Sequence, residues 1–121
     1  MEVLIVDDSA DAAASLTMLL ELEDIAVQSV GDAEAALEFV ASSTPLLMLI
    51  DIGLPGMNGY DVARVLRATY PSLRLIALTG YGQVADAEAA GVAGFDAHCT
   101  KPVTIAELLE EIEPVIVNSD S

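Results

Sequence analysis

Short apolar segments that alternate with longer, helix-like segments are the feature of this chain that most limits its possible folds. As Ala33, Ala36, Leu37 and Val40 illustrate, apolar residues in the longer segments recur every three or four positions, which is typical of amphipathic helices. Four short apolar runs lie at residues 3–6, 26–30, 46–50 and 73–78. A fifth strand, at residues 97–99, is expected mainly from its position in the chain. Alternating strands and helices form right-handed βαβ units. The sequence therefore predicts an α/β fold with a parallel sheet covered by helices on both faces.

Several helix starts are marked by residues that cap exposed backbone N–H groups. Thr104 and Glu107 form a capping box ahead of an apolar stripe that begins at Ile105. Asp32 and Asn58 have side chains preferred at the N-cap of two earlier helices. The segment 83–90 is mostly alanine with little apolar contrast, so it is predicted to be the least firmly anchored helix.

The size and charge of the chain limit its class and its partners. With 121 residues, 54% of them hydrophobic, it is expected to form one domain at residues 1–117, followed by a tail at 118–121. Its 20 acidic and 4 basic residues give a net charge of -16, which disfavours direct binding to nucleic acid or to an anionic membrane. Cys99 is the only cysteine, and no signal peptide or membrane span is evident, so a cytoplasmic location is expected.

Polar residues follow four of the five predicted strands. Asp7 and Asp8 follow the first, Asp51 the third, Thr79 the fourth, and Lys101, the only lysine, lies just beyond the fifth. In open parallel sheets the functional site lies outside the carboxyl ends of the strands. These three carboxylates, one hydroxyl and one ammonium are therefore predicted to converge on one edge of the sheet.

The chemistry of such a site can be inferred from its charges. Three neighbouring carboxylates repel one another, so either one is protonated or a cation lies among them. Oxygen ligands favour Mg²⁺, which commonly binds one or two carboxylates together with phosphate oxygens. A bound cation and Lys101 would together attract a phosphoryl group, whose transfer depends mainly on positioning and charge neutralisation. Asp51, at the centre of the set, is the predicted nucleophile that would form an aspartyl phosphate.

The motifs VDDS, DIGLPGMNGYD, ALTG and TKPV occur in this order after successive predicted strands. Together they closely resemble the receiver domain of two-component response regulators, the CheY-like family, over essentially the whole chain. The resemblance implies a doubly wound, flavodoxin-like fold with five parallel strands in the order 2-1-3-4-5. It also implies Asp51 as the phosphorylated residue and Lys101 and Thr79 as ligands of the phosphoryl group. The implied Mg²⁺ ligands are the acidic pair Asp7 and Asp8, with Asp8 binding directly, Asp51, and the backbone carbonyl of Gly53.

The same resemblance implies partners and a mode of action. The phosphoryl donor would be a histidine kinase or a histidine phosphotransfer domain, and phosphorylation would permit a homodimer. The domain would not be an enzyme beyond its own phosphorylation and slow autodephosphorylation. The stretches ADAAASLTMLLELE and AGFDAHCTKPV resemble receivers attached to hybrid sensor kinases more than regulators with a DNA-binding domain. The bond between Lys101 and Pro102 matches one that is commonly cis in the family.

The conformational switch of the family departs from its usual pattern here. Receivers commonly carry Tyr or Phe three residues before the lysine, and this side chain moves inward when the threonine shifts; the matching residue is His98. The predicted switch residues are Thr79, Tyr81 and His98, with Phe95 as a second aromatic candidate. By their position on the last strand, His98 is expected to be a partly buried ring and Cys99 a small apolar filler.

Other functions fit some of these residues. A phosphatase of the haloacid-dehalogenase type also forms an aspartyl phosphate, but it usually has a second Asp at the position held by Gly53. A flavodoxin-type cofactor binder would need a phosphate-binding loop where Asp7 and Asp8 would repel phosphate. A phospho-independent interaction module is the third alternative. Taken singly, Asp7 to Ser9 could simply cap a helix, Asp51 could begin an Asx turn, and Lys101 could be an ordinary surface lysine.

Overall fold

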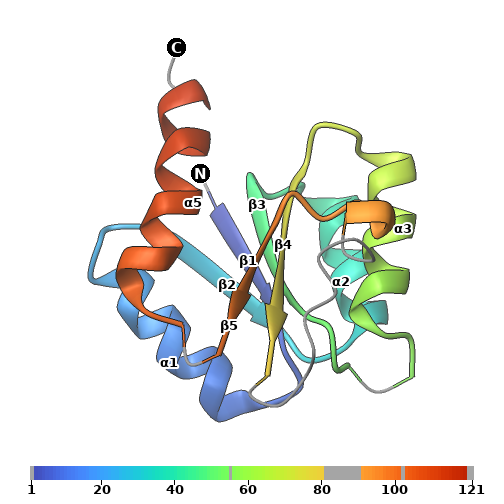
Figure 1. Ribbon diagram of the computed structural model, residues 1–121, viewed down its shortest axis with the longest axis horizontal. Coiled ribbons are helices and arrows are strands. Elements are labelled where there is room, and N and C mark those ends of the chain that lie inside the picture. The colour runs from blue at the N-terminus through green and yellow to red at the C-terminus, as the bar shows by residue number, and fades with distance from the viewer. Residues whose placement is uncertain (1, 55, 81–90, 102, 120–121) are drawn as a thin grey trace.

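The computed structural model describes residues 2–54, 56–80, 91–101 and 103–119 of the chain (Figure 1). The strands are β1 (Glu2–Val6), β2 (Ala26–Val30), β3 (Leu47–Asp51), β4 (Arg74–Thr79) and β5 (Ala97–Thr100). The helices are α1 (Ala10–Glu21), α2 (Ala33–Ser42), α3 (Gly59–Thr69) and α5 (Ile105–Ser119). Each of the five predicted strands is therefore present, within one residue of its expected bounds.

The strands form one parallel sheet in the order β2-β1-β3-β4-β5, which confirms the predicted fold class and strand order. Helices α1 and α5 cover one face of this sheet and α2 and α3 the other (Figure 1). Because all strands run the same way, their carboxyl ends meet at one edge of the sheet. None of the helices in the described part of the chain is long and apolar enough to cross a membrane.

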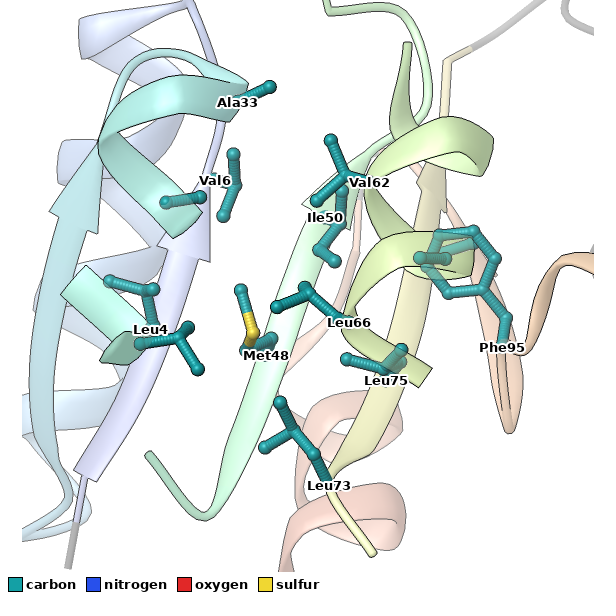
Figure 2. Packing of buried hydrophobic residues seen from close by; sticks show 14 of the residues in the cluster. Leu4, Val6, Ala33, Met48, Ile50, Val62, Leu66, Leu73, Leu75 and Phe95 are labelled. Atoms are coloured by element: carbon teal, nitrogen blue, oxygen red, sulfur yellow. The ribbon is translucent and has the colours of Figure 1, made fainter. Parts of the chain in front are cut away.

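The core between the sheet and helices α2 and α3 is made of alternate strand residues. Leu4 and Met48 point to this face from β1 and β3, and Val62 and Leu66 of α3 belong to the same buried cluster (Figure 2). Phe95, which precedes β5, closes the same cluster and packs edge-on against Tyr60, with ring centroids 6.1 Å apart. The apolar period seen in the sequence is thus the face that each helix buries against the sheet.

The opposite core lies under α1 and α5. Leu16 and Leu20 of α1 and Leu108 and Ile112 of α5 are buried there against the sheet. Cys99 belongs to this cluster and is buried, as the sequence predicted. Burial first, and then the charge of Glu107 and its neighbours on α5, raise the pKa of the Cys99 thiol, so an unreactive, space-filling cysteine is expected.

The predicted cap residues Asp32, Asn58 and Thr104 are confirmed. The side chains of Asp32 and Asn58 accept hydrogen bonds from backbone N–H groups in the first turns of α2 and α3, over 2.8 and 3.0 Å. Thr104 does the same for the N–H of Glu107, over 3.2 Å. Helix α1 is capped by Ser9, whose hydroxyl accepts from the N–H of Ala12. Each cap satisfies one backbone donor that has no partner inside its helix.

Strands β3, β4 and β5 each end one residue later than predicted. Asp51 and Thr79 are the last residues of β3 and β4, where the sequence placed them just after the strands. The reason is that backbone pairing continues past the apolar run, with Asp51 opposite Leu78 and Thr79 opposite Thr100. The predicted helix at 83–90 and the residue Tyr81 lie outside the described residues. The Lys101–Pro102 bond also lies partly outside them, because Pro102 is not described.

Candidate acidic site at the carboxyl edge of the sheet

Asp7 follows β1 directly, and its side chain is fully buried. Its Oδ1 accepts a hydrogen bond from the N–H of Ser9 over 2.9 Å, and its Oδ2 lies 2.8 Å from the Nζ of Lys101. The first contact lies in the loop that leads into α1. The alternative that residues 7–9 help to begin a helix is therefore correct in part. The second contact joins residues at opposite ends of the chain, and local capping does not explain it.

Asp51 ends the central strand, and its side chain is 12% exposed. Its Oδ1 accepts from the N–H of Gly53 over 2.9 Å, which is the predicted Asx turn. Its Oδ2 lies 3.3 Å from the Nζ of Lys101. The carboxylate is therefore oriented by its own loop on one side and by the lysine on the other.

Gly59, the first residue of α3, allows this loop to pack tightly. A Cβ atom added there would lie 2.6 Å from the Cα of Ile52 and 2.8 Å from the backbone oxygen of Asp51. Its N–H also donates to the carbonyl of Ile52 over 3.2 Å. Because no larger residue fits this approach, glycine at the start of α3 keeps the helix against the end of β3.

Lys101 lies between the two buried carboxylates, and its own side chain is 26% exposed. Burial alone would lower the pKa of this lysine. Its hydrogen bond to Asp7 and the negative charges of Asp51 and Asp7 outweigh burial and raise the pKa above its ordinary value. The ammonium is therefore charged and acts as the counter-ion of the site.

Asp8 completes the acidic group and, unlike Asp7, is exposed. One carboxylate oxygen from each of Asp7, Asp8 and Asp51 lies within 4.8 Å of the others. Three carboxylates against the single ammonium of Lys101 leave net negative charge at this edge. An oxygen-only donor set of this kind, open to solvent at Asp8, fits a hard cation such as Mg²⁺.

Thr79 is buried at the end of β4, and its hydroxyl points toward β5. Its Oγ1 lies 3.4 Å from the carbonyl oxygen of Cys99 and 3.4 Å from the Oγ1 of Thr100. Thr79 was predicted to be part of the site, whereas Thr100 was not. The only signal for Thr100 was its place immediately before Lys101 in the TKPV motif.

The expectation of a partly buried ring at His98 is wrong, because the residue is exposed. Neighbouring residues of a strand point to opposite faces, so the burial of Cys99 on the α1 and α5 side turns His98 to the other side. The buried strand residues on that side come from β1, β3 and β4. The predicted part of His98 and Phe95 in a switch stays a prediction, and Tyr81 lies outside the described residues.

The open parallel sheet, its strand order and the acidic group at its carboxyl edge define a doubly wound protein of the receiver class. The chain matches the family model of the response regulator receiver domain over residues 3–113 and belongs to that family. The resemblance found in its motifs is thereby confirmed.

Known proteins similar to this chain include curated response regulators and solved structures of receiver domains. The DNA-binding response regulator MtrA of Mycolicibacterium paratuberculosis is 36% identical over 118 residues, which cover 98% of this chain and 52% of that protein. A crystal structure of a CheY-like receiver domain protein from Methanospirillum hungatei is 30% identical, with a TM-score of 0.88 and with 98% of this chain and 95% of that chain covered. The signal receiver domain of a histidine kinase from Syntrophus aciditrophicus is 27% identical, with a TM-score of 0.86. The match covers 97% of this chain and 90% of that chain.

The chain spans about half the length of the curated relatives it matches. These relatives include a DNA-binding regulator, whereas one of the similar structures comes from a histidine kinase. Attachment of this receiver to a hybrid sensor kinase therefore stays a prediction.

Proposed function

We propose that this chain is a phospho-accepting receiver of a two-component phosphorelay, in which Asp51 takes a phosphoryl group from a histidine in a Mg²⁺-dependent reaction. The observation that supports this most is the position of Lys101, whose ammonium lies 2.8 Å from Asp7 and 3.3 Å from Asp51. A cation held against the acceptor carboxylate is placed to contact the oxygens of a phosphoryl group attached there.

In the proposed reaction, the P–N bond of a phosphohistidine breaks while a P–O bond to a carboxylate oxygen of Asp51 forms. The freed imidazole nitrogen keeps the electron pair of the broken bond. The protein contributes positioning and charge, which are what phosphoryl transfer chiefly requires. The N–H of Gly53 orients the carboxylate of Asp51. In the proposed reaction Lys101 moves from its carboxylate partners to one phosphoryl oxygen, and the hydroxyl of Thr79 donates to another.

The acidic group supplies the proposed metal site. Asp8 and Asp51 are the direct carboxylate ligands, Asp7 lies beside them, and the backbone carbonyl of Gly53 is the fourth protein group in the proposal. Bound Mg²⁺ would neutralise charge on the transferring group. Asp7, being buried and held by Ser9 and Lys101, orients Lys101 and also adds negative charge that attracts the cation.

The proposed partners are a histidine kinase or a histidine phosphotransfer domain. The domain would act on no external substrate and would catalyse only its own phosphorylation and slow dephosphorylation. Phosphorylation would shift Thr79 and the segment after it, including Tyr81, and His98 on β5 would respond. A homodimer formed on phosphorylation is part of the same proposal, and no direct contact with nucleic acid or membrane is expected from a net charge of -16.

The test is incubation with acetyl phosphate and Mg²⁺, followed by intact-mass measurement. The wild type should gain one phosphoryl group in an acid-stable, base-labile bond, and Asp51→Asn should gain none. Asp61→Asn is the matched control, because Asp61 is a solvent-exposed aspartate on α3 that pairs with Arg64; it should be labelled normally. Lys101→Ala should lower labelling while leaving Mg²⁺ binding largely intact.

Two results would contradict the proposal. Normal labelling of the Asp51→Asn protein would show that another residue accepts the phosphoryl group. Steady turnover of an added phosphomonoester by the wild type would instead favour a phosphatase of the haloacid-dehalogenase type.

A further inference from the structure

Thr100 is the residue at this edge that the proposed reaction leaves unused. It is opposite Thr79 in the pairing of β4 with β5, so the two side chains lie on the same face of the sheet. Their Oγ1 atoms are 3.4 Å apart. Thr79 is buried, whereas Thr100 is exposed. The pair thus joins a buried hydroxyl that the proposed function requires to an accessible hydroxyl beside Lys101.

The hydroxyl of Thr79 has one proton and two acceptor lone pairs. Among the described residues, it can donate to the carbonyl of Cys99 and to the hydroxyl of Thr100, each at 3.4 Å. Both distances are long for an O–H···O hydrogen bond, whose usual length is near 2.8 Å. The hydrogen bonds that the Thr79 hydroxyl can donate here are therefore weak, and the hydroxyl can rotate to donate instead to a better acceptor, such as an anionic phosphoryl oxygen.

Once that proton points at a phosphoryl group, the oxygen of Thr79 needs a donor from another direction. A carbonyl cannot donate, so the Cys99 carbonyl cannot serve. Thr100 has a hydroxyl proton of its own and lies on the same face. A chain from Thr100 to Thr79 to the phosphoryl oxygen would consist of hydrogen bonds that polarise one another.

We propose that Thr100 is a positioning residue for Thr79: its hydroxyl donates to Thr79 and so directs the Thr79 proton toward a phosphoryl group on Asp51. This inference rests on the proposed function. It involves hydrogen bonds only, and no covalent bond to Thr100 forms or breaks. Thr100 acts through Thr79 and is not itself a ligand of the phosphoryl group.

The experiment measures binding of beryllofluoride, a phosphoryl mimic, in the presence of Mg²⁺ by ¹⁹F NMR. Thr100→Val keeps the shape of the side chain and removes the hydroxyl, whereas Thr100→Ser keeps the hydroxyl. Loss of one neutral hydrogen bond corresponds to an affinity about three- to tenfold weaker. Thr100→Val should show this loss, and Thr100→Ser should stay within about twofold of the wild type. Thr69→Val is the control, because the Thr69 hydroxyl donates to the carbonyl of Val65 within α3.

A second comparison separates positioning from general structural damage. In a Thr79→Val background, Thr100→Val should cause no further loss, because residues that act through one another are not additive. Mg²⁺ affinity without beryllofluoride should be the same in all the Thr100 variants, since Thr100 touches no carboxylate of the acidic group in the described contacts.

Several outcomes would overturn the inference. These are wild-type affinity in Thr100→Val, an equal loss in Thr100→Ser, or an undiminished effect of Thr100→Val when Thr79 is already valine. Failure of the proposed function is distinguishable, because the wild type itself would then bind no beryllofluoride and would not be labelled at Asp51.

Discussion

At the scale of single residues, Asp7 and Asp8 are neighbours in the sequence with opposite surroundings. The Asp7 side chain is fully buried and held by the Ser9 N–H and by Lys101, whereas Asp8 is exposed. A carboxylate with its oxygens already occupied is poorly placed to exchange ligands. The accessible Asp8 is therefore the better candidate for direct metal binding, and Asp7 serves chiefly to orient Lys101.

Removal of the Asp7 carboxylate should destabilise the fold. Asp7→Ala deletes a charge-assisted hydrogen bond to Lys101 and leaves the N–H of Ser9 without its acceptor; charged hydrogen bonds of this kind contribute about 2 kcal/mol. Urea denaturation should show a loss of about this size. Asp61→Ala, which breaks an exposed pair with Arg64, should cost under about 0.5 kcal/mol. Equal effects of the two substitutions would show that the Asp7–Lys101 contact has no special structural weight.

Most individual site residues were predictable because they lie beside strand ends that the apolar runs already mark. Asp51 and Lys101 needed only this position and the rule that parallel strands share a carboxyl edge. His98 and Thr100 were different, because their environments depend on which face of β5 each one occupies. That face follows from pairing with β4, which the weak apolar signal of residues 97–99 does not reveal.

At the scale of elements, Arg67 joins three segments that are distant in the sequence. This residue, on the last turns of α3, donates to the carbonyls of Pro71 and Leu73 and twice to the carbonyl of Gly94. It also pairs with Asp96 over 2.8 Å, and Asp96 in turn accepts from the N–H of Leu75. The start of β4 and the approach to β5 are thereby fastened to α3. No local pattern predicts this, since most of its partners are carbonyls that any residue carries.

Replacement of Arg67 should loosen this end of the sheet. Arg67→Ala removes all the hydrogen bonds that Arg67 donates, and a loss of about 2–4 kcal/mol in the free energy of unfolding is expected. Arg67→Lys should recover little, because an ammonium lacks the planar fork of donors. Arg64→Ala is the control, since Arg64 lies on the same helix with only an exposed pair to Asp61. Amide exchange should also rise around residues 94–97 in Arg67→Ala, and unchanged exchange there would contradict the assigned role.

Across the whole chain, basic side chains are few, and each of them is already paired with an acidic side chain. The chain has 4 Lys and Arg residues against 20 Asp and Glu. All four basic side chains form ion pairs in the structure: Arg64, Arg67, Arg74 and Lys101. Negative charge is therefore in excess, and three carboxylates of this excess meet at Asp7, Asp8 and Asp51. Folding without a bound cation must work against this repulsion.

Neutralising Asp8 should therefore stabilise the metal-free protein. Two unit charges about 4.8 Å apart in water repel by roughly 1 kcal/mol, and the carboxylate oxygens of the acidic group lie within this distance of one another. Without Mg²⁺, Asp8→Asn should have a higher unfolding midpoint than the wild type, with a free energy of unfolding larger by up to about 1 kcal/mol. The same substitution at an exposed acid far from the site, Glu38→Gln on α2, controls for the change in net charge.

Added Mg²⁺ should reverse this order of stabilities. A ligand that binds only the folded state stabilises it in proportion to the logarithm of its concentration above the dissociation constant. Wild type and Glu38→Gln should both gain stability as Mg²⁺ is titrated, while Asp8→Asn should gain much less because one direct ligand has lost its charge. At high Mg²⁺ the wild type should then be the more stable protein. If Mg²⁺ stabilised Asp8→Asn as much as it stabilises the wild type, Asp8 would not be a direct ligand. The direct carboxylate ligands would then have to be assigned to Asp51 and Asp7.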